Sequence, residues 1–172
     1  GGAGRSAVAQ LGELTAGQLA QHVAALVARH RVAHFSCHGL QNPRDPSRSG
    51  LAVHDGFLTV ADLRAVTAGS RGDFAFLSAC KTAAGGVRLL DEALTVAAAL
   101  HYVGYRRVVG TLWSVPDLRA AALSSDVYRR IITSGRLDAA ASAGALHETV
   151  RELRRRFPAM PRLWASYVHL GR

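Results

Sequence analysis

The sequence predicts an α/β fold in which helices pack on both faces of a mostly parallel sheet. Short apolar segments at residues 32–37, 74–78 and 107–113 alternate with longer stretches whose apolar residues recur at helical spacing. Strands that alternate with helices in this way form parallel sheets. Residues 74–78 are apolar through most of their length, as expected of a strand buried on both faces. Neither an internal repeat nor a domain boundary is visible in the 172 residues, which indicates one domain.

The first predicted helix begins at Thr15, because Thr15 and Gln18 fit a capping box and an apolar stripe follows. The first core strand is expected over residues 32–37, and Gly39 ends it. His34, in the middle of this strand, is expected to be a core or hydrogen-bonding histidine. The polar stretch after Gly39 contains Pro, Ser, Asp and Arg and therefore predicts an exposed loop.

Residues 51–53 and 57–58 flank Asp55-Gly56, which is a hairpin signal between apolar runs. A short helix is predicted over residues 60–65. The second core strand comes next, followed by a loop with two adjacent glycines. A longer helix is then expected over residues 89–102.

The third core strand, residues 107–113, leads to Asp117, which is expected to cap a helix that continues to Ile131. A closing strand is predicted over residues 164–170. Between them lies a last helix with an apolar stripe expected to face the core, formed by Ala139, Ala143, Leu146, Val150 and Leu153.

Composition indicates an ordinary globular domain, with 49% hydrophobic and 19% charged residues. No apolar run approaches the roughly 18 residues that suggest a membrane span. Residues 1–10 are mostly small or polar and are expected to form a flexible terminus without a signal peptide. Two cysteines do not make a disulfide scaffold in a chain of this length, so a reducing, cytoplasmic location is expected. The chain is also expected to be part of a longer protein.

A formal net charge of +9 raises the possibility of nucleic-acid binding. Lys81 is the only lysine, and most of the arginines are scattered along the chain. Aromatic residues are not interleaved with them as a stacking platform would require. Nucleic-acid binding is therefore not indicated, and the arginines are interpreted as a solvated basic face.

Three predicted strand ends carry residues that can take part in catalysis or binding: Cys37-His38-Gly39, Cys80-Lys81-Thr82 and Trp113-Ser114. Ligands of parallel sheets bind outside the carboxyl ends of the strands, so these segments are expected to meet. A thiol attacks carbonyls as its thiolate, and a neighbouring histidine can take its proton and later protonate a leaving amine. The pattern predicts a dyad of His38 and Cys80, with backbone N–H groups of Gly39 and Cys80 stabilising an oxyanion.

Two other interpretations of these residues stay open. A cysteine at the end of an apolar strand is often a small buried hydrophobic residue rather than a nucleophile. Cys37, His38 and Cys80 could also ligate zinc, but structural zinc sites use four ligands with closely spaced pairs, which are missing from this sequence. No metal and no cofactor is therefore expected.

Four segments resemble the CHAT domain, the caspase-like module often found behind tetratricopeptide repeats. They are residues 32–39 around His38, 77–82 around Cys80, 108–117 with Trp113 and 164–171 at the C-terminal end, and a hairpin over 49–59 has a counterpart as well. The resemblance implies a caspase-like three-layer α/β/α sandwich with a mostly parallel sheet. Residues 1–172 would be the C-terminal catalytic portion, and the N-terminal part of the domain would be missing.

The resemblance implies that Cys80 is the nucleophile and His38 the general base or ion-pair partner of a cysteine endopeptidase that acts through an acyl-enzyme. Trp113 and Ser114 would line a groove for a protein or peptide substrate, and Asp117 would orient the substrate or a loop. Members of this clan often select a basic residue before the cut, for which Asp45, Asp73 and Asp91 are candidates by position.

The resemblance also leaves open how this activity is used. It suggests gating by tetratricopeptide-repeat or sensor domains of a parent chain. The alternative is a non-catalytic domain that keeps the fold and binds other proteins.

Overall fold

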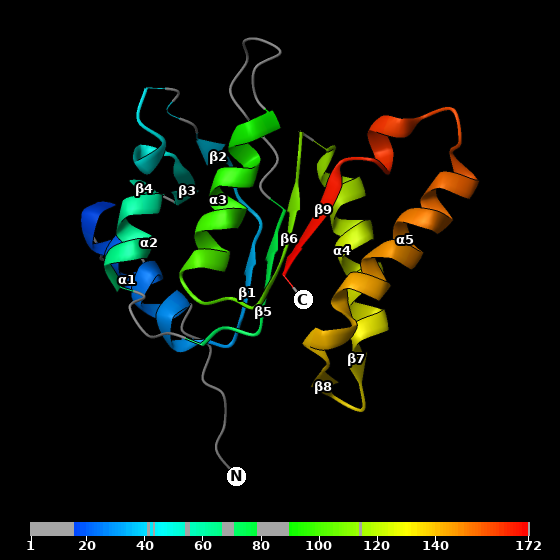
Figure 1. Ribbon diagram of the computed structural model, residues 1–172, viewed down its shortest axis with the longest axis horizontal. Coiled ribbons are helices and arrows are strands. Elements are labelled where there is room, and N and C mark those ends of the chain that lie inside the picture. Colours follow the sequence, from blue (N-terminus) through cyan, green and yellow to red (C-terminus); the bar gives the residue numbers. More distant parts are fainter. Residues whose placement is uncertain are drawn as a thin grey trace.

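A four-stranded sheet forms the centre of the molecule (Figure 1). The computed structural model describes residues 16–40, 42, 44–53, 56–66, 71–78, 90–113 and 115–171. The strand order is β1-β5-β6-β9, in which β1, β5 and β6 are parallel and β9 is antiparallel to β6. These strands are β1 (Val32–Phe35), β5 (Phe74–Leu77), β6 (Arg107–Thr111) and β9 (Tyr167–Gly171). The predicted α/β fold with a mostly parallel sheet is confirmed.

Helices cover both faces of this sheet (Figure 1). On one face lie α1 (Ala16–Arg29), α2 (Val60–Val66) and α3 (Leu90–Tyr102), and on the other lie α4 (Asp117–Ile131) and α5 (Ser142–Arg156). The side chains of β5 alternate between the two layers. Ala75 and Leu77 pack with the first set of helices, and Phe74 and Phe76 with the second. All four residues are buried, as predicted for a strand covered on both faces.

The strand β1 lies at an edge of the sheet and is less buried than the sequence indicates. Its residues alternate between exposed and half-buried, and Val32 is 39% exposed. His34 is a hydrogen-bonding histidine, as expected: its Nδ1 lies 3.0 Å from the hydroxyl oxygen of Tyr128 in α4. The ring stacks on Phe76 with centroids 5.2 Å apart. Partial burial between these rings lowers the pKa of His34.

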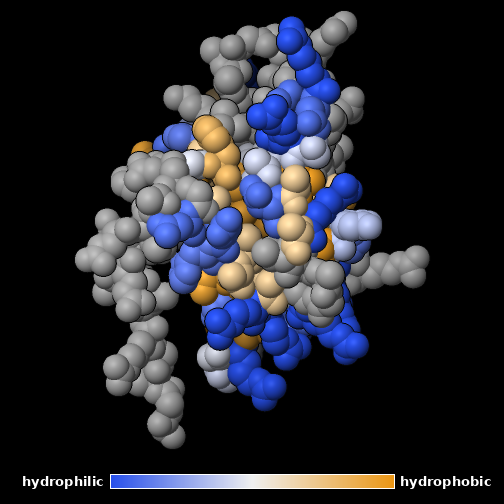
Figure 2. Space-filling view, turned by 90° about the vertical axis from the view of Figure 1, so that its left-hand side faces the viewer, coloured by the Kyte–Doolittle hydropathy of each residue, from blue (hydrophilic) through white to orange (hydrophobic). Residues whose placement is uncertain are grey.

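A second, three-stranded antiparallel sheet follows β1 in the chain. It consists of β2 (Gly39–Leu40), β3 (Gly50–Val53) and β4 (Gly56–Thr59), with a short 3-10 helix, η2 (Pro46–Arg48), between β2 and β3. The hairpin predicted around Asp55-Gly56 is confirmed by the pairing of β3 with β4, and the predicted short helix is α2. On the side of the molecule that carries α1, α2 and this sheet, a band of hydrophobic side chains lies between hydrophilic ones (Figure 2).

Gly72 and Tyr105 fix the end of α1 against the loop that precedes β5. A Cβ atom on Gly72 would lie 2.4 Å from the ring of Tyr105, so only glycine leaves room for this ring. Tyr105 is fully buried, and its hydroxyl lies 2.9 Å from each of the carbonyl oxygens of Val27 and His30, to which it donates. Burial raises the pKa of Tyr105 to about 12, so the hydroxyl stays a donor.

The C-terminal part adds elements that the sequence did not predict. A hairpin of β7 (Ile132–Thr133) and β8 (Arg136–Leu137) follows α4, and its turn residues Ser134 and Gly135 both have positive φ. In the chain, the 3-10 helix η3 (Ala139–Ala141) precedes α5, and the 3-10 helix η4 (Pro161–Leu163) follows it.

Two details of the predicted helices were wrong. Ala143 is exposed, although its predicted stripe faces the core through Leu146. Asp117 is the first residue of α4 rather than its cap: Pro116 occupies the cap position, and no side chain caps this end. Among the described residues, no helix is long and apolar enough to cross a membrane.

Candidate active site

The carboxyl ends of β1, β5 and β6 point to the same edge of the sheet, at the top of Figure 1. The strands β1 and β5 are direct neighbours, an arrangement that is compatible with the predicted dyad. Their register pairs Val32 with Phe74 and Phe35 with Leu77, in each case 42 positions apart. His38 and Cys80 are also 42 positions apart, and each comes three residues after the last paired residue of its strand.

His38 lies between the two sheets and is exposed. It follows β1 by three residues and directly precedes β2. Its carbonyl oxygen accepts a hydrogen bond of 2.7 Å from the N–H of Ala52 in the second sheet. The second sheet therefore holds the backbone at His38 while the side chain faces solvent.

The N–H of Gly39, the predicted oxyanion donor, is not used by the ladder between β2 and β3. Gly39 pairs with Leu51 in the antiparallel ladder between β2 and β3. Hydrogen-bonded and non-hydrogen-bonded pairs alternate in such a ladder, and the adjacent pair of His38 and Ala52 is a bonded one. The pair of Gly39 and Leu51 is therefore a non-bonded pair, in which the N–H of Gly39 points away from β3.

Cys80 lies outside the described residues, and Ser78 is the last residue described before it. The N–H of Ser78 donates a 2.8 Å hydrogen bond to the carbonyl of Phe35, which continues the parallel ladder past Leu77. Ser78 is buried, and its hydroxyl has no hydrogen-bond partner within the described part of the chain. The ladder thus continues to within two residues of Cys80.

Cys37 packs as part of the core. It is half-buried and packs against the core cluster that contains α1 and α3. Burial raises its pKa to about 11, so it is almost entirely protonated at neutral pH. Of the two cysteines, Cys80 is therefore the one left as a candidate nucleophile.

Trp113 lies just past the end of β6 and is half-buried. Its indole N–H donates a 3.3 Å hydrogen bond to the carbonyl of Arg162 in η4. The N–H of Leu112 donates to the carbonyl of Ser166 at 2.7 Å, so two bonds join the end of β6 to the segment before β9. The 3-10 helix η4 was not predicted, although Pro158 and Pro161 mark a turn there, and the closing strand predicted over 164–170 is β9, which begins at Tyr167.

The other residues predicted to contact the substrate are Asp117 and Ser114. Asp117 is exposed in the first turn of α4, at the same edge of the sheet as Trp113. Ser114 lies outside the described residues.

The acidic candidates for selecting a basic residue differ in position. Asp73 is wrong for this role, because it precedes β5 at the opposite edge of the sheet and pairs with Arg31 at 2.6 Å. Asp45 accepts hydrogen bonds from the N–H and the hydroxyl of Ser47. The side chain of Asp91 is outside the described part of α3. The described residues also contain no group of three or more His, Cys, Asp or Glu side chains that could hold a metal ion.

The structure has a mostly parallel sheet between two helical layers, which is the architecture of a caspase-like α/β fold. His38 follows β1, and Cys80 follows the neighbouring strand β5 in the sequence. The family model for the CHAT domain matches residues 2–172. The chain therefore belongs to the CHAT domain family, which is related to the caspase-like cysteine peptidases. No curated protein gave a significant match to the chain.

Proposed function

We propose that this chain is a cysteine endopeptidase in which His38 activates Cys80. The observation that carries the proposal is the register of β1 and β5. Directly opposed residues in this pair are 42 positions apart, the same separation as between His38 and Cys80. Neighbouring parallel strands are about 4.8 Å apart, so residues that continue this register are within reach of a hydrogen bond between side chains.

The chemistry follows from the roles of these groups. The imidazole of His38 takes the thiol proton of Cys80, and the thiolate attacks the scissile carbonyl. The N–H groups of Gly39 and Cys80 stabilise the oxyanion. The imidazolium then protonates the leaving amine, and water hydrolyses the acyl-enzyme. The orientation of the Gly39 N–H away from β3 supports its part in this scheme.

Trp113, Ser114 and Asp117 contribute the wall of a groove that holds the substrate as an extended segment. The support for this role is the position of Trp113 and Asp117, which follow β6 at the same edge of the sheet as His38. We further propose that other domains of a parent protein gate this activity, because a free endopeptidase would damage its host.

The test is the rate of Cys80 alkylation by iodoacetamide across a range of pH, in a Cys37→Ala background that leaves one thiol. A thiol paired with His38 should show an apparent pKa below the usual value of about 8.5, and His38→Ala should raise it. His147→Ala is the matched control, because His147 is exposed on α5, on the face of the sheet that α4 and α5 cover. An apparent pKa that is unchanged by His38→Ala contradicts the dyad and favours a non-catalytic binding domain. A lowered pKa leads to a screen of peptide libraries for hydrolysis.

A further inference from the structure

Five arginines belong to three segments that come together at the upper right of Figure 1, namely the beginning of α4, the end of α5 and η4. We call them the arginine cluster: Arg119, Arg154, Arg155, Arg156 and Arg162. Within the described part of the chain, none of them forms an ion pair. Other arginines on the same two helices do, since Arg130 pairs with Glu152 at 2.8 Å and Arg151 pairs with Glu148 at 3.4 Å. Among the described residues, no carboxylate therefore neutralises the cluster through a direct ion pair, although Asp117 shares the first turn of α4 with Arg119.

Two aromatic rings organise the cluster. The guanidinium groups of Arg119 and Arg156 lie 5.1 and 5.4 Å from the ring centroid of Phe157. The guanidinium of Arg154 lies 5.4 Å from the ring centroid of Trp164, whose indole N–H donates to the carbonyl of Phe157 at 3.1 Å. The rings position the guanidinium groups, whose N–H groups can donate to an acceptor. The ring faces occupied in this way are not available for stacking of nucleic-acid bases.

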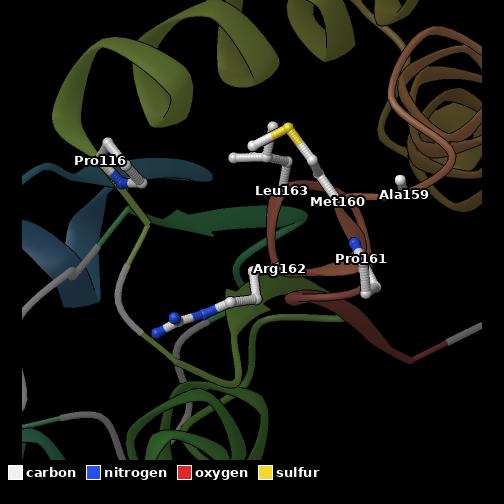
Figure 3. A pocket seen from close by; sticks show the side chains of 6 residues that line it. All are labelled: Pro116, Ala159, Met160, Pro161, Arg162 and Leu163. Carbon is white, nitrogen blue, oxygen red and sulfur yellow. The ribbon is translucent and has the colours of Figure 1, made fainter.

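An apolar pocket adjoins the cluster (Figure 3). Its volume of about 520 Å³ lies in the range of about 300–1,000 Å³ that is typical of ligand pockets. Met160 and Leu163 lie side by side, Pro116 faces them, and the side chain of Arg162 extends along another side. Ala159 and Pro161 complete the lining, and Met160 is 53% exposed. Arg162 therefore belongs both to the pocket and to the arginine cluster.

We propose that the pocket and the arginine cluster together bind an acidic segment of a partner protein that also carries an apolar side chain. Carboxylates match the planar guanidinium groups, to which they bind in bidentate fashion. The apolar side chain would enter the pocket beside Met160 and Leu163, where burial of apolar surface stabilises the complex. A nucleic acid would supply phosphates but no apolar group for the pocket. This binding does not depend on the proposed His38–Cys80 chemistry.

The test is fluorescence anisotropy with labelled peptides of about 12 residues, which span about 40 Å when extended. The probes are a glutamate–leucine peptide, a glutamate–serine peptide, a lysine–leucine peptide and a single-stranded oligouridylate. The wild-type chain should bind the glutamate–leucine peptide, and binding should weaken at high salt. The double variant Arg154→Ser/Arg156→Ser should bind it roughly tenfold more weakly. Met160→Ser should weaken binding of the glutamate–leucine peptide but not of the glutamate–serine peptide.

The matched control is Arg129→Ser/Arg151→Ser, which removes the same charge from α4 and α5 at arginines that are already ion-paired. This control should leave binding of the glutamate–leucine peptide nearly unchanged. Failure of that peptide to bind, or an equal loss in the two double variants, overturns the proposal. Tighter binding of the oligouridylate through the same arginines also overturns it and identifies the partner as nucleic acid. All four substituted arginines are exposed, so both double variants are expected to fold, which circular dichroism checks.

Discussion

Phe35 in β1 lies directly opposite Leu77 in β5, and the carbonyl of Phe35 accepts a hydrogen bond from the N–H of Ser78. This bond carries the parallel ladder beyond the paired residues toward the segments that contain the two cysteines. Cys37 is half-buried against the core, whereas Cys80 follows the end of the ladder. The two thiols are therefore expected to behave differently.

In a Cys80→Ala variant, we expect the remaining thiol to react slowly in the native state. Burial raises the pKa of Cys37 to about 11, so very little thiolate is present at pH 8. Intact-mass analysis after treatment with iodoacetamide should show almost no adduct until denaturant is added. Fast native labelling of this variant would contradict the buried position of Cys37.

We expect the free energy of unfolding to decrease as the pH falls below about 6.5, in part through His169 in β9. Burial, together with the charge of Arg107 and His101, lowers the pKa of His169 in the folded chain. The unfolded chain therefore binds more protons than the folded one between the lowered pKa and 6.5, so stability rises with pH in that window. His34, whose pKa burial also lowers, contributes in the same direction.

The measurement for His169 is urea unfolding at pH 7.5 and at pH 5 in the wild type and in His169→Gln. Ser142 donates to the carbonyl of Ala139, so its hydroxyl accepts from Nε2 of His169, 3.0 Å away. Glutamine keeps an N–H donor for this bond but does not titrate. The loss of stability between the two pH values should be smaller in the variant. An identical loss in both proteins would assign the pH dependence to other groups.

Gly72→Ala is expected to destabilise the fold by about 1–3 kcal/mol, because the new methyl group overlaps the ring of Tyr105. Thermal or chemical unfolding measures this change. The same substitution at Gly144 is the control, since a Cβ there meets nothing within 4 Å and φ is not positive. Alanine in that helix position should be neutral or stabilising. An equal effect of the two substitutions would show that the contact with Tyr105 carries little energy.

Tyr105→Phe is expected to cost about 1–2 kcal/mol, because it leaves the carbonyl groups of Val27 and His30, in a buried and a partly buried position, without the hydroxyl donor. The ring stays in place, so the loss isolates the hydrogen bond from the packing. Unfolding in urea at neutral pH measures it, with Tyr102→Phe as the control, since Tyr102 is exposed. A Tyr105→Phe protein as stable as the wild type would mean that other donors replace the hydroxyl.

Trp113→Phe should increase the rate at which trypsin cleaves after Arg162. The indole bond to the Arg162 carbonyl helps to hold η4 against the end of β6, and phenylalanine has no donor to replace it. The bond is 3.3 Å long and exposed, so we expect less than about 1 kcal/mol of change in global stability. Cleavage after Arg136, in the distant β7–β8 hairpin, is the internal control and should not change.

The elements with strong local patterns could be predicted from sequence. The fully apolar run from Phe74 to Leu77 can only be a buried strand in this context, and the predicted hairpin is formed by β3 and β4. The predictions that were wrong or missing concern features that depend on the position of a segment in the fold rather than on its sequence pattern. The segment around Val32 is as apolar as a buried strand, but its place at the sheet edge leaves it partly exposed. The β7–β8 hairpin was missed because two-residue strands give no periodicity.

In the candidate site, too, some features could be predicted from the sequence and others depend on the fold. The sequence predicts that His38 and Cys80 each follow a core strand of a parallel sheet, but only the structure shows that these two strands are direct neighbours. The sequence did not reveal that Phe157 and Trp164 lie among arginines from two helices, since Arg119 of α4 reaches Phe157 at the end of α5 only in the folded chain. The position of Asp73, by contrast, could have been predicted from the sequence. Asp73 directly precedes the strand predicted over residues 74–78, so it lies at the opposite end of that strand from Cys80.

The positions of Trp113 and Trp164 make tryptophan fluorescence a useful probe of this molecule. The chain has two tryptophans, and each indole N–H is bonded to a backbone carbonyl, of Arg162 and Phe157 respectively. Trp113 lies where the end of β6 meets η4, and Trp164 lies where η4 meets the end of α5. Tryptophan emission therefore reports on the surroundings of η4, and a change in its wavelength or intensity would signal an arriving peptide without any attached dye.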